Sequence, residues 1–141
     1  MANAYINVYM NNPTQDKTDG TLVSSDGAQT SPIAATLDAS KAESKIIKLA
    51  IRCEAGYTTD TDGAKIDFTG TTAGKWLVAY SAGNTADAAP ADSAFSTSAT
   101  IPLAIGQKNV VFWAKATSTT DENPQNDISV KLRVSAKIVA L

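Results

Sequence analysis

Three aspartates close together in the chain are the best candidate for a metal site. Asp60, Asp62 and Asp67 surround Gly63 in the segment TTDTDGAKID. Calcium prefers several oxygen ligands gathered in one flexible loop, so this segment offers part of a calcium site. The segment lacks the third acidic position and the terminal glutamate of an EF-hand. An Asp-Gly hairpin turn between two strands explains the same residues without a metal, and we expect neither a metal nor a cofactor.

A second acidic segment lies nearer the C-terminus and invites the same two interpretations. Its oxygen-bearing side chains are Asp121, Glu122, Asn123, Asn126 and Asp127. The segment either supplies metal ligands or forms a solvated turn around Asn123 and Pro124, and we expect the turn.

Residues for nucleophilic or acid–base catalysis are almost absent. The chain has no histidine, which excludes Ser-His-Asp and Cys-His catalysis and every histidine-ligated metal site. Cys53 is the only cysteine, so it forms no internal disulfide and no thiolate zinc site by itself. It alternates with apolar residues, and we expect it to be a small buried side chain. The carboxylates fall in expected turns, so we expect the protein not to be an enzyme and assign no catalytic residue.

Two tryptophans and a row of basic residues are candidate binding groups. Trp76 and Trp113 would suit sugar stacking, but a position between two sheets, or at a subunit interface, explains them better. Lys131, Arg133 and Lys137 share one face of the last expected strand. Such a row either protects against edge-to-edge aggregation or docks an acidic partner.

The elements that must position these residues are strands. Apolar side chains alternate with polar ones from Ile128 to Ile138, which is the period of a strand with one buried face. Residues 110–116 are apolar on both faces and predict a central strand covered on each side. In all, the pattern predicts about eight strands, at residues 4–10, 33–37, 44–54, 65–69, 75–81, 99–105, 110–116 and 128–138. No helical pattern separates them, so an antiparallel sandwich is expected.

Two long polar stretches interrupt the strands. Residues 11–31 predict a long loop or extended arm, and residues 83–98 a surface loop that Phe95 anchors. Residues 56–64 predict a turn-rich loop. Because ordering polar loops costs about 1–2 kcal/mol per residue, we expect contacts with other molecules to hold them.

Length and charge limit the classes of function. The 141 residues predict one domain, residues 1–141, with a single core. A net charge of −2 and a pI near 4.9 argue against nucleic-acid binding. No apolar run approaches the ~20 residues of a membrane span, and no secretory signal is visible. Synthesis and folding in a cytoplasm, without membrane contact, are therefore expected.

The C-terminal part also resembles a known fold family. ATIPLAIGQKNVVFWAKA and DISVKLRVSAKI, within residues 99–138, resemble the last three strands of bacterial and phage immunoglobulin-like domains. In that family an apolar strand ends at a glycine turn, an aromatic central strand follows, and a long alternating strand closes the sheet. The resemblance implies an antiparallel immunoglobulin-like β-sandwich.

The whole chain is similar to small virion proteins of tailed bacteriophages, above all head decoration proteins. The shared features are a short chain without signal or disulfide, rich in Ala, Thr, Ser and Gly. This resemblance implies a non-enzymatic virion structural protein that decorates or cements a capsid after assembly in the host bacterial cytoplasm. The implied partners are a major capsid protein and further copies of this chain. The alternatives are a tail or baseplate accessory domain and an immunoglobulin-like module that binds carbohydrate or a surface.

Overall fold

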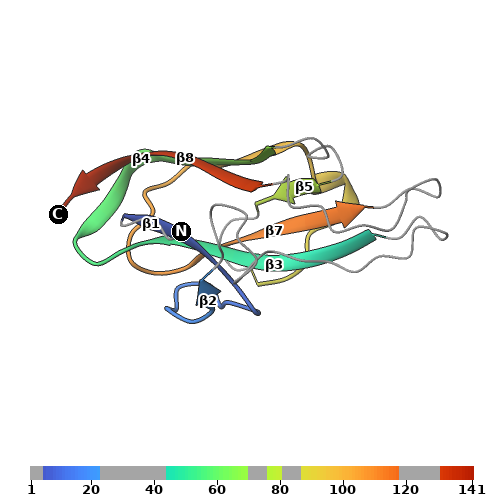
Figure 1. Ribbon diagram of the computed structural model, residues 1–141, viewed down its shortest axis with the longest axis horizontal. Helices are drawn as coiled ribbons and strands as arrows, with labels where there is room; N and C mark the ends of the chain where they lie inside the picture. The colour runs from blue at the N-terminus through green and yellow to red at the C-terminus, as the bar shows by residue number, and fades with distance from the viewer. Residues whose placement is uncertain (1–4, 23–43, 70–75, 81–86, 118–130) are drawn as a thin grey trace.

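In a computed structural model of the protein, the strands form two antiparallel sheets (Figure 1). The structure describes residues 5–22, 44–69, 76–80, 87–117 and 131–141. The larger sheet has the strand order β2-β1-β3-β7-β5 and the smaller one β6-β4-β8. The bounds are β1 Ile6–Met10, β2 Thr21–Leu22, β3 Ser44–Cys53, β4 Tyr57–Thr69, β5 Trp76–Ala79, β6 Ser98–Ile101, β7 Val110–Thr117 and β8 Lys131–Ala140. A 3-10 turn, Asp92–Ala94, is the only helical element among the described residues. The prediction of an all-β chain of two antiparallel sheets is confirmed.

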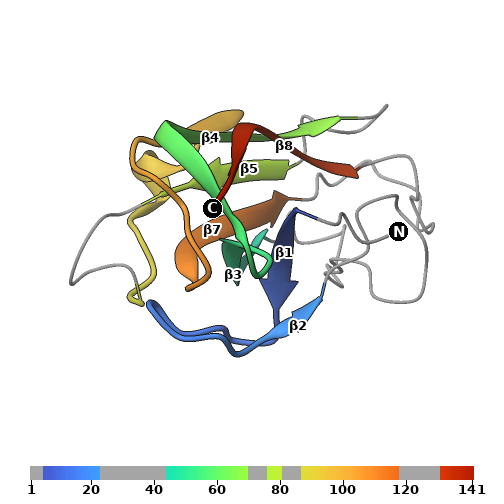
Figure 2. The same ribbon diagram turned by 90° about the vertical axis from the view of Figure 1, so that its left-hand side faces the viewer.

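The main core lies between the two sheets, as Figure 2 shows from the side. It follows directly from the alternation in β3 and β7, since Leu49, Ile51 and Phe112 all point toward the smaller sheet and are fully buried. Ile66 of β4 and Ile101 of β6 meet them from the other side. Each such side chain contributes roughly 1.5–3 kcal/mol by leaving water.

The segment around Phe95 covers part of the opposite face of the larger sheet. Phe95 is buried there against a small cluster that includes Ala50, Val111 and Trp113. Backbone hydrogen bonds between Val78 and Ser96 fix the same segment beside β5. The predicted anchoring by Phe95 and the predicted double covering of residues 110–116 are both confirmed.

The predicted loop at residues 56–64 is wrong, because these residues belong to the long strand β4. The register of β4 with β8 shifts between Thr59 and Ala64, where β4 carries extra residues in a bulge. Asp62 and Gly63 lie in this bulge and not in a hairpin turn. Gly63 has a φ of 72°, a left-handed conformation that glycine adopts readily. Hairpin turns with an Asp-Gly pair use the same conformation.

The last strand joins the smaller sheet. The immunoglobulin-like pattern implies that the long alternating strand closes the sheet of the central strand, but β8 pairs with β4 while β7 lies in the larger sheet between β3 and β5. The predicted strand 33–37 and the acidic segment 121–127 lie outside the described residues, as does the part of the predicted arm that follows Leu22.

Candidate functional site

The three aspartates of the candidate calcium site do not converge. The Asp67 side chain is held on the outer surface of the smaller sheet by Arg133, whose Nε donates to Oδ1 at 2.8 Å. Asp60 Oδ1 accepts from the backbone N–H of Asp62 at 3.1 Å within the bulge. Among the residues that the structure describes, no three acidic or cysteine side chains are grouped as metal ligands would be.

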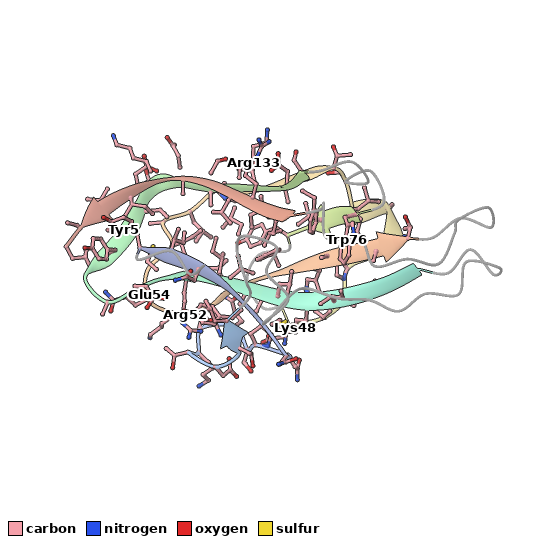
Figure 3. All side chains as sticks on the ribbon, in the orientation of Figure 1. Tyr5, Lys48, Arg52, Glu54, Trp76 and Arg133 are labelled. Atoms are coloured by element: carbon pink, nitrogen blue, oxygen red, sulfur yellow. The ribbon has the colours of Figure 1, made fainter. Side chains whose placement is uncertain are left out.

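The basic row on β8 is partly neutralised. Arg133 stands directly opposite Asp67 in the register of β8 with β4, and its hydrogen bonds hold the pKa of that carboxyl below its usual value. Lys137 is exposed, and Arg133 lies on the outside of the smaller sheet (Figure 3). The pattern therefore located the cations correctly but could not show that one of them already has a partner.

Trp76 is partly buried and Trp113 is almost fully buried. The Trp76 ring lies 5.2 Å from the ring of Phe68 on the smaller sheet, so it packs between the sheets as predicted. Trp113 is only 9% exposed, but it does not lie between the sheets. It packs with Phe95 on the outer face of the larger sheet, because its position in β7 points away from Phe112.

The densest polar network lies where residues 13–19 fold back onto the larger sheet. Asn109, which is fully buried, is its centre. Its Nδ2 donates to the backbone oxygen of Thr14 at 3.0 Å and to Asp19 Oδ1 at 2.8 Å. Its backbone N–H donates to Lys17 and its carbonyl accepts from Asp16. Loop and strand are therefore bonded through both the side chain and the backbone of one residue.

Asp19 closes the loop from the inside. Its carboxylate accepts from the backbone N–H and from the hydroxyl of Thr14, both at 2.8 Å. The backbone adopts left-handed conformations at Asn11, Asn12 and Asp16, and at Gly20 as well. These residue types tolerate that conformation, so the cluster of Asn, Asp and Gly was the sequence signal for this compact loop.

Arg52 links the loop to the aromatic side chain of β1. Its guanidinium donates to Asn109 Oδ1 at 2.6 Å and to the backbone oxygen of Asp19 at 2.9 Å. The same group lies 3.5 Å from the centroid of the Tyr9 ring, a cation–π contact. Tyr9 donates in turn to Glu54 at 2.8 Å. Figure 3 shows Arg52 and Glu54 on the side of the larger sheet that faces away from the smaller one.

Gln15 and Asp87 connect the two polar stretches that the sequence analysis treated separately. Gln15 donates its backbone N–H to Asp87 Oδ1 at 3.0 Å, while its side-chain oxygen accepts from the backbone N–H of Val111. Lys48 lies 2.7 Å from the same Asp87 oxygen. Residues 13–19 and 87–97 thus form one outer layer over the larger sheet, which we call the loop layer. Its contacts are internal, so residues 13–19 do not need an external partner to hold them.

A shallow, open hollow marks the exposed surface of the loop layer. Its lining consists of Thr14, Asp16, Lys17, Thr18, Asp19 and Lys108. Within this lining the Asp19 carboxylate is occupied by hydrogen bonds from Thr14 and Asn109.

Cys53 should be chemically silent in the folded protein. Its side chain is 2% exposed, its Sγ donates to the carbonyl of Ile105 at 3.3 Å, and burial raises the pKa of the thiol. Both effects suppress the reactive thiolate. We expect labelling by a thiol reagent at pH 7.5 to be orders of magnitude slower than in urea, and fast in both conditions for an exposed thiol introduced by Ser135→Cys in a Cys53→Ala background. Rapid labelling of native Cys53 would show that this end of β3 opens readily.

Acid should loosen the loop layer. Hydrogen bonds from Thr14 lower the pKa of Asp19, and the bond from Lys48 lowers the pKa of Asp87. A lowered folded-state pKa gives stability that is present above the unfolded value of about 3.9 and is lost as pH falls through the folded value. The urea midpoint should therefore be flat from pH 7 to 5 and fall below about pH 4. In Asp19→Asn the fall should be shallower, and an equal slope would exclude Asp19 as a contributor.

Comparisons with known proteins leave the chain without an assigned family. No protein-family model matches it, and neither a curated protein nor a solved structure is significantly similar to it. Within the described residues, no helix is long and apolar enough to cross a membrane.

Proposed function

We propose that the protein is a non-enzymatic structural component of a tailed-phage virion, which decorates or cements the capsid through protein–protein contacts. The observation that carries this proposal is that three potentially reactive side chains are occupied by contacts within the chain. Cys53, Asp19 and Asp67 are each engaged in contacts that hold the fold together. What the molecule offers to other molecules is a preformed surface.

Rigidity of that surface favours a binding role. The loop layer is tied to the larger sheet through Asn109, Arg52 and the ion pair of Asp87 with Lys48 before any partner arrives. A surface that is already ordered loses little conformational entropy on binding, so more of the contact energy becomes affinity. The proposed partners are a major capsid protein and further copies of the chain on the particle, in a virion assembled in the bacterial cytoplasm.

An immunoglobulin-like relationship would extend the proposal. It rests on the pattern of residues 99–138, with the glycine turn at Gly106 between β6 and β7. The pairing of β8 with β4 departs from that pattern.

Co-sedimentation with capsids that lack the protein tests the proposal. Deleting residues 1–31 would be a poor probe, because β1 pairs with β3 and Val8 is part of the core. Lys17→Glu/Lys108→Glu instead changes the hollow of the loop layer, and Lys65→Glu, on the exposed face of β4, is the matched control. We expect wild type and the control to bind alike and the double variant to bind at least about tenfold more weakly, the effect of losing roughly 1.4 kcal/mol.

Two outcomes would contradict the proposal. One is that the protein pellets with no capsid preparation from the phage or prophage that encodes it. The other is that it binds purified tails or immobilised glycans and does not bind capsids. Binding to tails would assign the tail or baseplate alternative, and binding to glycans the surface-binding alternative.

A further inference from the structure

Strand β8 is unlike every other edge of the two sheets. Its ten residues pair with β4 on one side, and no strand in the described residues pairs with the other side (Figure 1). The other edges are short, since β2 has two residues, β5 four and β6 four, and Pro102 follows β6. Proteins limit edge pairing with short strands, charged side chains, prolines, bulges or charges that point toward the core. Of these devices β8 carries the basic residues Arg133 and Lys137 on its outer face. β8 contains no proline, and the bulge in its ladder lies on β4.

The inward row of β8 is incompletely buried. Leu132 and Val134 pack against the main core but are only partly buried, and Ile138 is partly buried as well. Ala136, between them, is exposed. A strand added along the open edge would cover these side chains with its own inward row. The occupant must therefore alternate apolar and polar residues.

The sequence of β8 meets that requirement for itself. In an antiparallel pair of two β8 strands centred on Ser135, Leu132 of one copy stands opposite Ile138 of the other, and Val134 stands opposite Ala136. Apolar residues thus meet on the inner face in every such position. On the outer face Arg133 stands opposite Lys137 and Ser135 opposite its own copy, while Lys131 stands opposite Val139. A shift by one residue would exchange the faces, whereas a shift by two keeps them, so the pattern fixes which faces meet. The register centred on Ser135 is one of the two that pair nine of the ten residues of β8.

We propose that two copies of the chain associate through their β8 edges, around a two-fold axis at Ser135. The product is a continuous six-stranded sheet in the order β6-β4-β8-β8-β4-β6. The inference concerns the purified protein and stands whether or not the chain binds a capsid.

Charge sets the strength of this association. The register places Arg133 opposite Lys137 of the other copy, twice in each dimer, and like charges in opposite positions oppose pairing. Asp67 neutralises Arg133 within each copy and limits the repulsion. The wild-type dimer should therefore form weakly and tighten as salt screens the cations.

Cysteine cross-linking tests the register. Directly opposed residues of an antiparallel pair have Cα atoms about 4.5–5.5 Å apart, a separation that a disulfide accepts. Mild oxidation of Ser135→Cys should give disulfide-linked dimers at micromolar concentration, while buried Cys53 stays out of the reaction. Lys65→Cys is the control, because β4 strands of the two copies would lie three strand spacings, about 14 Å, apart. Equal cross-linking of both variants would indicate random collisions and overturn the proposal.

A charge reversal tests the same interface without a covalent bond. Lys137→Glu replaces two repulsive pairs with two attractive ones, so sedimentation equilibrium should show a dimer tighter by roughly 2- to 30-fold, at about 0.2–1 kcal/mol per pair. If wild type and Lys137→Glu both stay monomeric at several hundred micromolar, the β8 edge does not pair with itself.

Discussion

Gly63→Ala should destabilise the protein more than a glycine-to-alanine change at any other described glycine. A Cβ at this position would overlap the carbonyl oxygen of Ile101 and lie 2.5 Å from that of Leu103. Both oxygens belong to backbone, which cannot swing aside as a side chain would. The φ of 72° adds about 1–2 kcal/mol of strain for an L-residue. With about 1–3 kcal/mol for overpacking, the total loss should be roughly 2–5 kcal/mol, a large fraction of the 5–15 kcal/mol typical of a domain.

Two other glycines separate the collision from the strain. Gly56 has a φ of 90° but no atom within 4 Å of a Cβ, so Gly56→Ala should lose only the strain of about 1–2 kcal/mol. Gly106 has open space and no left-handed φ, and Gly106→Ala should lie within about 0.5 kcal/mol of wild type. Urea unfolding followed by tryptophan fluorescence measures all three. Equal losses for Gly63→Ala and Gly56→Ala would mean that the β4 bulge relaxes away from β6.

Removing the side chain of Asn109 should produce the second large effect. Asn109→Ala deletes the donor to Thr14 and Asp19 and the acceptor for Arg52, all at a fully buried position. The cost of buried groups left without partners, added to the bonds lost, predicts about 2–4 kcal/mol. Asp19 and Arg52 are charged, which places the expectation toward the upper end of that range.

The effect should be local before it is global. Amide hydrogen exchange at Thr14 and Asp16 should accelerate in Asn109→Ala, because both N–H groups bond within the network. Gln107→Ala, an exposed change two residues away, is the control and should alter neither the exchange nor the urea midpoint. Unchanged exchange in Asn109→Ala would show that residues 13–19 hold their conformation without the Asn109 side chain.

Periodicity made most of the sheet structure predictable. The alternation around Leu49 and Ile51 gave β3 with its buried face, and the apolar run at Val110–Ala116 gave a central strand. These predictions succeed because side chains two positions apart in a strand lie on the same face, so the residue types along the strand indicate which face is buried. The anchoring role of Phe95 was also predictable, because a single large apolar residue in a polar stretch is expected to be buried.

The polar network was not predictable in the same way. Asn109 lies between the predicted strands 99–105 and 110–116, and its partners Thr14 and Asp19 are about ninety residues away in the chain. No local spacing relates them. The Asp62–Gly63 pair gave a wrong prediction of a hairpin turn. A bulge and a turn can both require a glycine in the left-handed conformation, so the dipeptide does not distinguish them.

The sequence by itself determined that this chain forms strands and which faces of those strands are apolar. These properties follow from side-chain chemistry over a few neighbouring residues. The sequence predicted residues 11–31 only as a long loop or extended arm, within which Thr21–Leu22 forms the strand β2. Only the tertiary structure decided that β8 joins β4 and not β7, that Trp113 lies under Phe95, and that Asn109 unites the loop layer with the larger sheet. Each of these depends on which surfaces meet, and sheet partners and buried polar pairs are chosen by packing between segments that are remote in sequence.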